Sequence, residues 1–216
     1  MKLGEPRHAL FDLDDTIYPS SVGIMHVVSQ RINEYMALRL GMDDATIKEL
    51  RPRYWKQYGT TLRGLVVDFG IDPDDYLGYV HDFAVADVLT PNPRLDNALR
   101  ALPWRKSIFT NASGRHARQV LSALGVGSHF ERIFDIRDTG YVGKPHPVAY
   151  HRVVASLGIE AQQCIALDDS IPNLLTAKRL SMITVLVGSV DQVDAADFSI
   201  GRIEDVAELA SEITRL

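Results

Sequence analysis

The chain has 216 residues, of which 46% are hydrophobic, a proportion typical of folded globular proteins rather than disordered ones. Its 28 acidic and 23 basic residues give a formal charge of −5, so neither a nucleic-acid partner nor a membrane surface is expected. The single cysteine, Cys164, excludes an internal disulfide and a cysteine-based zinc site, and we expect it to be a core residue. No signal peptide or membrane-spanning run is recognisable, which favours a cytoplasmic protein.

Short apolar segments rich in β-branched or aromatic residues recur along the chain and predict the strands of one sheet. They are residues 8–14, 106–110, 132–136, 163–168 and 182–187, with a last strand near 197–201. Segments with helical periodicity follow at 116–124, 146–158, 171–180 and 202–214. Strands that alternate with helices indicate βαβ units, so we predict an α/β fold with a doubly wound, Rossmann-like parallel sheet.

Residues 20–90 interrupt this alternation, because they contain helical patterns and no convincing strand. A helical stripe of apolar residues runs through 22–40, and helical patterns continue as far as residue 89. We therefore expect a helical insert over residues 19–90, with its hinges at the turns YPSS and TPNP. The core would then consist of residues 1–18 and 91–216.

Three aspartates follow the first predicted strand, in the segment FDLDDT. Asp12 and Asp14 are two residues apart, so in a strand their side chains share a face, whereas Asp15 projects away. In an open parallel sheet, ligands bind beyond the carboxyl ends of the strands, which is where this pair lies. Taken alone, however, the pattern fits a helix cap and a solvated loop better than a site.

Further polar residues stand at the ends of predicted strands or before predicted helices. Thr110 and Asn111 end the second predicted strand, and Asp168 and Asp169 end the fourth. Lys144 lies in the segment GKP, directly before the helix predicted over residues 146–158. Each has a plain structural interpretation, as a helix cap or an exposed loop residue. Their joint occurrence in this order indicates instead one site at the edge of the sheet.

These four segments together resemble the motifs of the haloacid dehalogenase-like hydrolase superfamily. FDLDDT resembles the nucleophile motif, FTN the second motif, GKP the third-motif lysine, and ALDDS the acidic fourth motif. The segments DLDDTIYPSSVGI, YGTTLRGL, FTNAS and ALDDSIPN are similar to signatures of the pyrimidine 5'-nucleotidase-like branch. The resemblance implies hydrolysis of a small phosphorylated metabolite, a pyrimidine nucleoside 5'-monophosphate being favoured, and an insert that acts as a cap.

The resemblance also implies roles for the core residues. Asp12 would be the nucleophile that forms an aspartyl-phosphate, and Asp14 would act first as an acid and then as a base. Lys144 would neutralise the transferring group and steady Asp12. The Thr110 hydroxyl and the main-chain N–H of Asn111 would hold phosphate oxygens.

A divalent cation is expected in this site. Asp12, Asp14, Asp168 and Asp169 together with a phosphate dianion bring far more negative charge than Lys144 offsets, and two like charges 4 Å apart cost roughly 4 kcal/mol. Oxygen ligands favour Mg²⁺. In the family pattern the side chains of Asp12 and Asp168 and the main-chain carbonyl of Asp14 hold the metal. Asp169 would be a ligand through water or an orienting acid.

Substrate choice should reside in the insert, because the core motifs bind only phosphate. Arg63, in YGTTLRGL, is the predicted contact outside the phosphate. Tyr54, Trp55 and Tyr58 could stack on a base, but their spacing favours packing inside the insert. His116 is expected to be an exposed residue near the start of a helix.

Other functions remain open at this point. The substrate could be a sugar phosphate, pyridoxal phosphate or phosphoglycolate, and a phosphomutase would differ only in what accepts the phosphoryl group. Carbon–halogen hydrolysis needs neither a second acid nor a metal, so Asp14 and the pair Asp168–Asp169 argue against it. A catalytically silent binding domain usually lacks one of the acids, and none is missing. The chain could be a monomer or a homodimer.

Overall fold

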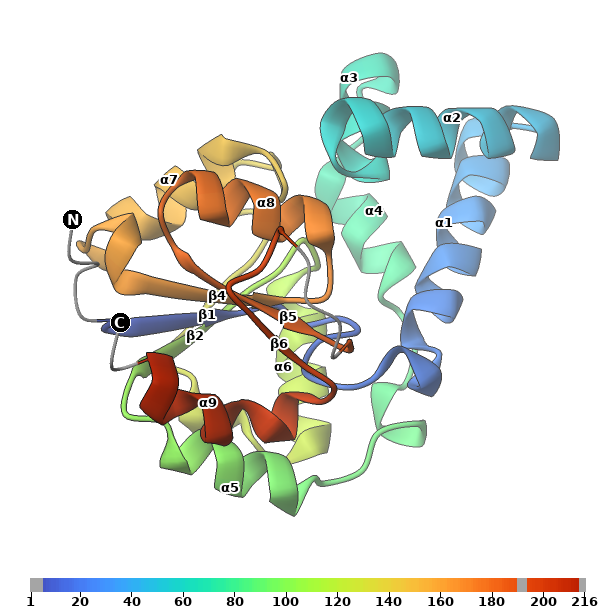
Figure 1. The fold of residues 1–216 in the computed structure, drawn as a ribbon. Coiled ribbons are helices and arrows are strands. Elements are labelled where there is room, and N and C mark those ends of the chain that lie inside the picture. The colour runs from blue at the N-terminus through green and yellow to red at the C-terminus, as the bar shows by residue number, and fades with distance from the viewer. Residues whose placement is uncertain (1–5, 190–193, 214–216) are drawn as a thin grey trace.

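Six short strands form one parallel sheet in the computed structural model, which describes residues 6–189 and 194–213 (Figure 1). They are β1 His8–Phe11, β2 Arg105–Phe109, β3 Arg132–Phe134, β4 Cys164–Asp168, β5 Ile183–Val187 and β6 Phe198–Ile200. The spatial order is β3-β2-β1-β4-β5-β6, and all neighbouring strands are parallel. β1 therefore lies inside the sheet, between two strands that come much later in the sequence.

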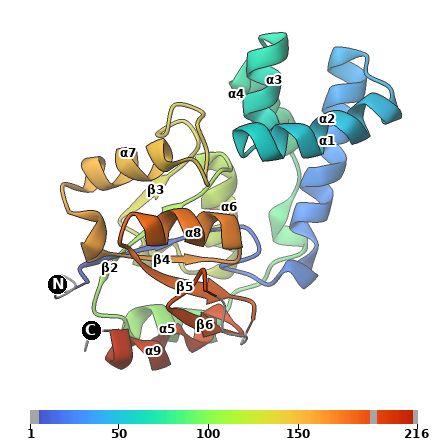
Figure 2. The same cartoon turned by 45° about the horizontal axis from the view of Figure 1, so that its top comes forward.

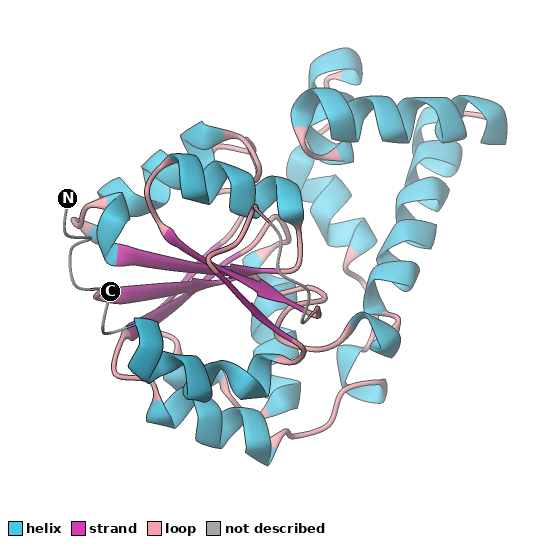
Figure 3. Ribbon diagram, viewed as in Figure 1, coloured by secondary structure: helices cyan, strands magenta, loops and turns pink. Residues whose placement is uncertain are grey.

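Helices cover both faces of the sheet (Figure 3). One face packs against α5 Pro93–Ala101, α6 Gly114–Leu124 and α9 Val206–Ile213, and the other against α7 Pro147–Leu157 and α8 Ile171–Arg179. Successive strand residues alternate between the faces, so that Ile108 belongs to one apolar cluster and Phe109 to the other. Cys164 is buried in the second cluster. This arrangement confirms the predicted doubly wound α/β fold.

Four helices between β1 and α5 form a lobe beside the sheet (Figure 2). They are α1 Ile24–Leu40, α2 Asp44–Tyr58, α3 Thr61–Phe69 and α4 Pro73–Val80. Met36, Tyr54, Leu65 and Leu77, one from each helix, belong to an apolar cluster distinct from the two that cover the sheet. The lobe lies within the residues that the sequence predicts as an insert. No helix in the described part of the chain is both long and apolar enough to cross a membrane.

Two segments differ from the predicted elements. α4 ends at Val80, and a short 3-10 helix at Val85–Asp87 follows it, so the helical pattern does not continue unbroken to residue 89. The sequence pattern does not predict α5, because TPNP resembles a turn. Proline nevertheless fits the first position of a helix, and the Asn92 side chain caps α5 by accepting the N–H of Leu95. Further 3-10 helices cover Ser20–Val22, Gly127–His129, Ala161–Gln163 and Ile203–Asp205.

The first strand is shorter than predicted, since it ends at Phe11 rather than at residue 14. The N–H of Asp12 still donates to the carbonyl of Leu167 on β4, at 2.9 Å. The chain then leaves the sheet, and Asp15 adopts a left-handed conformation with φ 62°. The alternation of a strand therefore does not govern where the acidic side chains of this segment point.

Candidate active site

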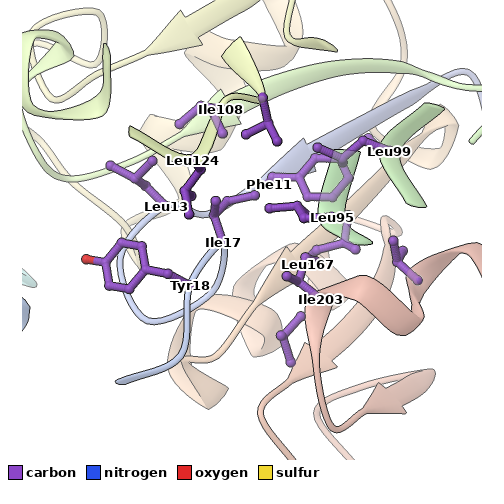
Figure 4. Close-up of a cluster of buried hydrophobic side chains, with 14 of the residues drawn as sticks. Phe11, Leu13, Ile17, Tyr18, Leu95, Leu99, Ile108, Leu124, Leu167 and Ile203 are labelled. Atoms are coloured by element: carbon purple, nitrogen blue, oxygen red, sulfur yellow. The ribbon is translucent and has the colours of Figure 1, made fainter. Parts of the chain in front are cut away.

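The loop that follows β1 is anchored by apolar side chains (Figure 4). Leu13, Ile17 and Tyr18 are buried in the larger core cluster. Asp12 and Asp14 flank Leu13 and line a cavity of about 420 Å³ at the carboxyl ends of the strands. The mixture of apolar and acidic residues in FDLDDTIY therefore holds the carboxylates at the edge of the sheet.

Lys144 connects two of the predicted site acids. Its Nζ lies 2.7 Å from Asp12 Oδ1 and 2.7 Å from Asp168 Oδ2, and its side chain is only 3% exposed. Burial alone would lower the pKa of Lys144, but the charges of Asp12 and Asp168 outweigh burial and raise it. The structure thus brings a permanently charged ammonium group from the loop before α7 between the ends of β1 and β4.

The acids at the end of β4 are held by further hydrogen bonds. Asp168 accepts from Asn173 Nδ2, at 2.9 and 3.0 Å to its two oxygens, and from the N–H of Ser170 at 2.9 Å. Thr16 donates its hydroxyl to Asp169 Oδ1 and accepts the N–H of Asp169, both at 3.0 Å. These bonds join β4 to the loop after β1. Thr16 ends the motif FDLDDT and Asn173 ends the segment ALDDSIPN, but the sequence assigns neither of them a role in the site.

Three carboxylates fit a divalent metal. Asp12, Asp168 and Asp169 each offer one oxygen, and these three oxygens lie within 4.8 Å of one another. An all-oxygen set of this kind suits Mg²⁺, which usually keeps several waters in its coordination sphere. The side chain of Asp14 is not part of this group, and the expected role of its main-chain carbonyl as a metal ligand stays a prediction.

Thr110 and Asn111, at the end of β2, also line the cavity. The Thr110 hydroxyl accepts the N–H of Ala112 at 3.0 Å, which leaves its own proton free to be donated. The Asn111 side chain makes two hydrogen bonds to the main chain of Lys144. Asn111 Nδ2 donates to the carbonyl oxygen of Lys144 at 2.9 Å, and Asn111 Oδ1 accepts the N–H of Lys144 at 2.8 Å. Asn111 therefore also fixes the loop that carries Lys144, a role that the sequence does not reveal.

Asp14 is held by two donors. The Tyr18 hydroxyl donates to Asp14 Oδ1, and His116 Nε2 lies 2.9 Å from the same oxygen. Burial alone would raise the pKa of Asp14, but these hydrogen bonds lower it, so the carboxylate form is favoured before a ligand binds. The expectation that His116 is exposed is wrong, because its ring is 0% exposed. At the start of a helix, the sequence pattern does not show whether a histidine faces the core or the solvent.

Asp15 faces the same cavity, contrary to the expectation that it projects away. The reason is the early end of β1, because a left-handed turn replaces the strand alternation at this residue. Burial, followed by the charges of Asp169 and Asp14, raises the pKa of Asp15 to about 6. The cavity is therefore strongly acidic on the side of the sheet.

The helical lobe forms the opposite wall of the cavity. Met25, Val28 and Ile32 from α1 give this wall an apolar surface. Trp55 from α2 also lines the cavity and is 56% exposed, so it does not pack inside the lobe as expected. Tyr54, in contrast, is fully buried and donates its hydroxyl to Asp68, as expected for a packing residue.

The charged residue of this wall is Arg51 rather than Arg63. Arg51 lies one helical turn before Trp55 and lines the cavity. Its Nη1 lies 3.0 Å from Ser29 Oγ and 2.6 Å from Asn33 Oδ1, whereas its buried Nε has no hydrogen-bond partner among residues 6–189 and 194–213. Arg63 is half-buried and outside the cavity wall, although the wall includes the preceding residues 60–62. Each residue along a helix turns about 100°, which takes Arg63 away from the cavity.

Comparison with known proteins identifies the family. A profile of haloacid dehalogenase-like hydrolases matches residues 6–180, a span that contains every residue of the acidic cluster. The chain therefore belongs to the haloacid dehalogenase-like hydrolase family. The match agrees with the four motifs found in the sequence, but it does not distinguish the pyrimidine 5'-nucleotidase-like branch.

Individual relatives extend over most of the chain. Phosphate metabolism protein 8 of Saccharomyces cerevisiae is 25% identical over 200 residues, which cover 84% of this chain but only 62% of the yeast protein. A phosphoglycolate phosphatase of Colwellia psychrerythraea is 26% identical over 201 residues, and these residues cover 85% of that phosphatase. Among solved structures, L-2-haloacid dehalogenase from Xanthobacter autotrophicus superposes with a TM-score of 0.62, 18% identity and coverage of 95% and 98% of the two chains. At this identity the likeness concerns the fold alone.

Proposed function

We propose that this protein is a Mg²⁺-dependent phosphatase that hydrolyses small phosphomonoesters through an aspartyl-phosphate. The observation that carries the proposal is Lys144, which bridges Asp12 and Asp168 beside a cavity lined by Thr110. This arrangement supports Asp12 as the nucleophile, Lys144 as a fixed cation and Thr110 as a hydroxyl donor to a phosphoryl group. The likeness to a phosphoglycolate phosphatase supports the same class of reaction.

In the first step Asp12 attacks phosphorus. Lys144 holds Asp12 Oδ1 at 2.7 Å, which limits the rotation of the carboxylate and offsets negative charge beside the transferring group. The Thr110 hydroxyl and the N–H of Asn111 provide donors for the phosphoryl oxygens. Asn111 also keeps the Lys144 loop in place through its two main-chain bonds.

Mg²⁺ would be held by the carboxylates of Asp12, Asp168 and Asp169, whose oxygens already lie close together. When bound, the ion would offset the charges of these acids and of the phosphate, and so allow the dianion to enter. Asn173 and Ser170 orient Asp168 for this purpose. Such bonds to a ligating carboxylate fix its direction and contribute to metal affinity.

Asp14 is the proposed proton donor and acceptor. A phosphate dianion beside Asp14 raises its pKa, because negative charge favours the neutral carboxyl group. Asp14 can then protonate the leaving oxygen and later take a proton from the attacking water. Carbon–halogen hydrolysis would need no such group, so Asp14 and the pair Asp168–Asp169 favour phosphate ester hydrolysis.

For the substrate we propose a nucleoside 5'-monophosphate, with pyrimidines favoured. A cavity of about 420 Å³ falls in the range of small-molecule pockets. The exposed Trp55 offers a flat aromatic surface for a base, and Arg51 offers N–H donors for its carbonyl groups. The lobe at residues 19–90 would act as a cap that closes over the phosphate. Phosphoglycolate, which is smaller, would leave the apolar wall uncovered.

The test is a phosphomonoester panel measured with the purified chain. UMP, CMP, AMP, phosphoglycolate, sugar phosphates, pyridoxal phosphate and p-nitrophenyl phosphate are compared with Mg²⁺ and with EDTA. We expect metal-dependent release of phosphate and the highest kcat/KM with UMP or CMP. No turnover in a folded sample would support a silent binding domain, and a preference for phosphoglycolate would overturn the substrate assignment but not the chemistry.

A further inference from the structure

Two side chains from different elements contact one and the same oxygen of Asp14. Tyr18, in the loop after β1, donates its hydroxyl to Oδ1, and His116, in the first turn of α6, brings Nε2 to 2.9 Å from it. The other oxygen, Oδ2, has no hydrogen-bond partner among the described residues, and Asp14 lines the cavity. The two oxygens of this carboxyl group therefore have different surroundings.

The surroundings of His116 determine which nitrogen carries its proton. The ring is completely buried, and Nδ1 has no hydrogen-bond partner in the described part of the chain. A proton on Nδ1 would be a buried donor without an acceptor, which costs about 1–3 kcal/mol. The tautomer with its proton on Nε2 avoids this cost. Nε2 then donates to Asp14 Oδ1, as the Tyr18 hydroxyl does.

A second histidine fits this assignment. The rings of His116 and His81 stack with centroids 4.6 Å apart and planes inclined by 24°. Burial lowers the pKa of His81, so His81 is neutral near pH 7. His81 Nδ1 lies 3.1 Å from the carbonyl oxygen of Leu77, which fixes that ring in turn. His116 is therefore held by packing from one side and by Asp14 from the other.

Tyr18 is fixed in a similar way. Its ring belongs to the larger core cluster, whereas its hydroxyl points away from the labelled apolar side chains in Figure 4. The ring is 2% exposed, so it has little freedom to turn its hydroxyl elsewhere. Both donors to Asp14 are thus held by the fold itself, independently of any ligand.

We propose that Tyr18 and His116 are positioning residues that keep Asp14 Oδ1 as an acceptor only, so that Oδ2 alone exchanges protons with the reacting groups. This inference rests on the proposed phosphatase function and assigns the reacting oxygen within it. If Oδ1 carried the proton, one of the two donors would face it without an acceptor. A proton on Oδ2 satisfies all three groups, and Asp14 lines the cavity.

Both chemical steps then use the same oxygen. In the first, the bond between Asp12 and phosphorus forms, the ester P–O bond breaks, and the proton on Asp14 Oδ2 moves to the leaving oxygen. In the second, a water oxygen bonds to phosphorus, the bond to Asp12 breaks, and one water proton moves to Oδ2. The products are the free alcohol and inorganic phosphate, and Asp14 is again protonated.

The test compares esters whose leaving groups differ in basicity. kcat/KM reports the steps up to cleavage of the ester bond, in which p-nitrophenolate leaves readily without a proton and an alkoxide does not. In His116→Leu we expect kcat/KM to fall at least about 10-fold more for alkyl phosphates than for p-nitrophenyl phosphate. In His116→Gln the amide N–H can replace Nε2–H, so this variant should keep most of the kcat/KM for alkyl phosphates that His116→Leu loses.

Tyr18→Phe is the second variant, and it tests the positioning of Asp14 on its own if His116→Leu fails to fold. It removes one donor, keeps the ring, and should show the same dependence on the leaving group. Tyr35→Phe is the matched control, because it removes a buried tyrosine bond to Asp75 outside the cavity wall and should leave the dependence unchanged. Equal losses for all esters in the folded variants would overturn the positioning role. A wild-type chain that cleaves none of the esters would overturn the phosphatase function itself.

Discussion

The two walls of the cavity differ in how their side chains are held. On the sheet side, Lys144, Asp168 and Asp169 are each fixed by hydrogen bonds to other residues of the site. On the lobe side, Trp55 is 56% exposed, and Arg51 Nε has no hydrogen-bond partner in the part of the chain that the structure describes. The hydrogen bonds of the sheet wall are therefore in place before any ligand binds, whereas the lobe wall keeps apolar surface toward the cavity. Under the proposed function, reaction and selectivity are separated between two regions of one chain.

The largest effect is expected from the sheet wall. Asp12→Asn removes the proposed nucleophile and should lower kcat for p-nitrophenyl phosphate by at least about 10³-fold, with no phosphoenzyme trapped on acid quenching. Asp82→Asn is the control, because Asp82 is exposed and outside the cavity wall. Turnover of Asp12→Asn within tenfold of the wild type would show that another group attacks phosphorus.

A smaller effect is expected where the lobe touches the sheet wall. Gly59 has φ +81°, and a Cβ there would lie 2.9 Å from the carbonyl oxygen of Lys144. Gly59→Ala should displace the Lys144 loop and lower kcat/KM about 10- to 100-fold. Gly41→Ala is a matched control with φ +66° and no atom near the new Cβ.

Both glycine variants should lose about 1 kcal/mol of unfolding free energy, because each forces alanine into a left-handed conformation. Thermal melts and p-nitrophenyl phosphate kinetics would be measured together on the two variants. If Gly41→Ala lost as much activity as Gly59→Ala, the contact with Lys144 would not be the cause.

The lobe wall should change selectivity rather than chemistry. Arg51→Ala should raise KM for UMP about tenfold, the equivalent of one charge-assisted hydrogen bond, with little change for p-nitrophenyl phosphate. Arg63→Ala, outside the wall, should change neither value. Steady-state kinetics of both variants on both substrates would show which arginine contacts the substrate. A larger rise in the KM for UMP in Arg63→Ala than in Arg51→Ala would support the contact that the sequence predicts.

The smallest effect should come from the ion pair that joins the lobe to the core. Arg137 Nε lies 2.7 Å from Asp74 Oδ1, and both side chains are well exposed. Asp74→Asn should lower the unfolding free energy by about 0.2–1 kcal/mol, and less at high salt. Denaturant melts at two salt concentrations would measure it. A loss well above this range would mean that the pair, rather than the apolar contacts, holds the lobe against the core.

The sequence predicts the sheet wall well, because strand ends impose geometry on it. Polar residues that follow apolar strands of a parallel sheet must meet at one edge, so the positions of Asp12, Thr110 and Asp168 along the chain are enough to group them. Their partners are less accessible from sequence. Asn173 and Thr16 lie in the quoted segments ALDDSIPN and FDLDDT, but only the fold shows that they hydrogen-bond to the β4 acids.

The lobe wall is predicted poorly for a physical reason. Which residue of a helix faces a cavity depends on how that helix is rotated, and one position changes the direction by about 100°. The helical pattern therefore cannot separate Arg51 from Arg63, nor Trp55 from the packed Tyr54. His116 escapes prediction in the same way, because a buried polar contact leaves no mark in the local pattern.

The interior position of β1 has a consequence for how the enzyme matures. His8 pairs with Arg105 on one side and with Cys164 on the other, so the strand that precedes Asp12, the proposed nucleophile, emerges from the ribosome long before either neighbour. Contacts of such high sequence separation slow folding. The lobe is complete before the first of those neighbours is made, and a nascent chain acquires its full acidic cluster only once β4 has been translated.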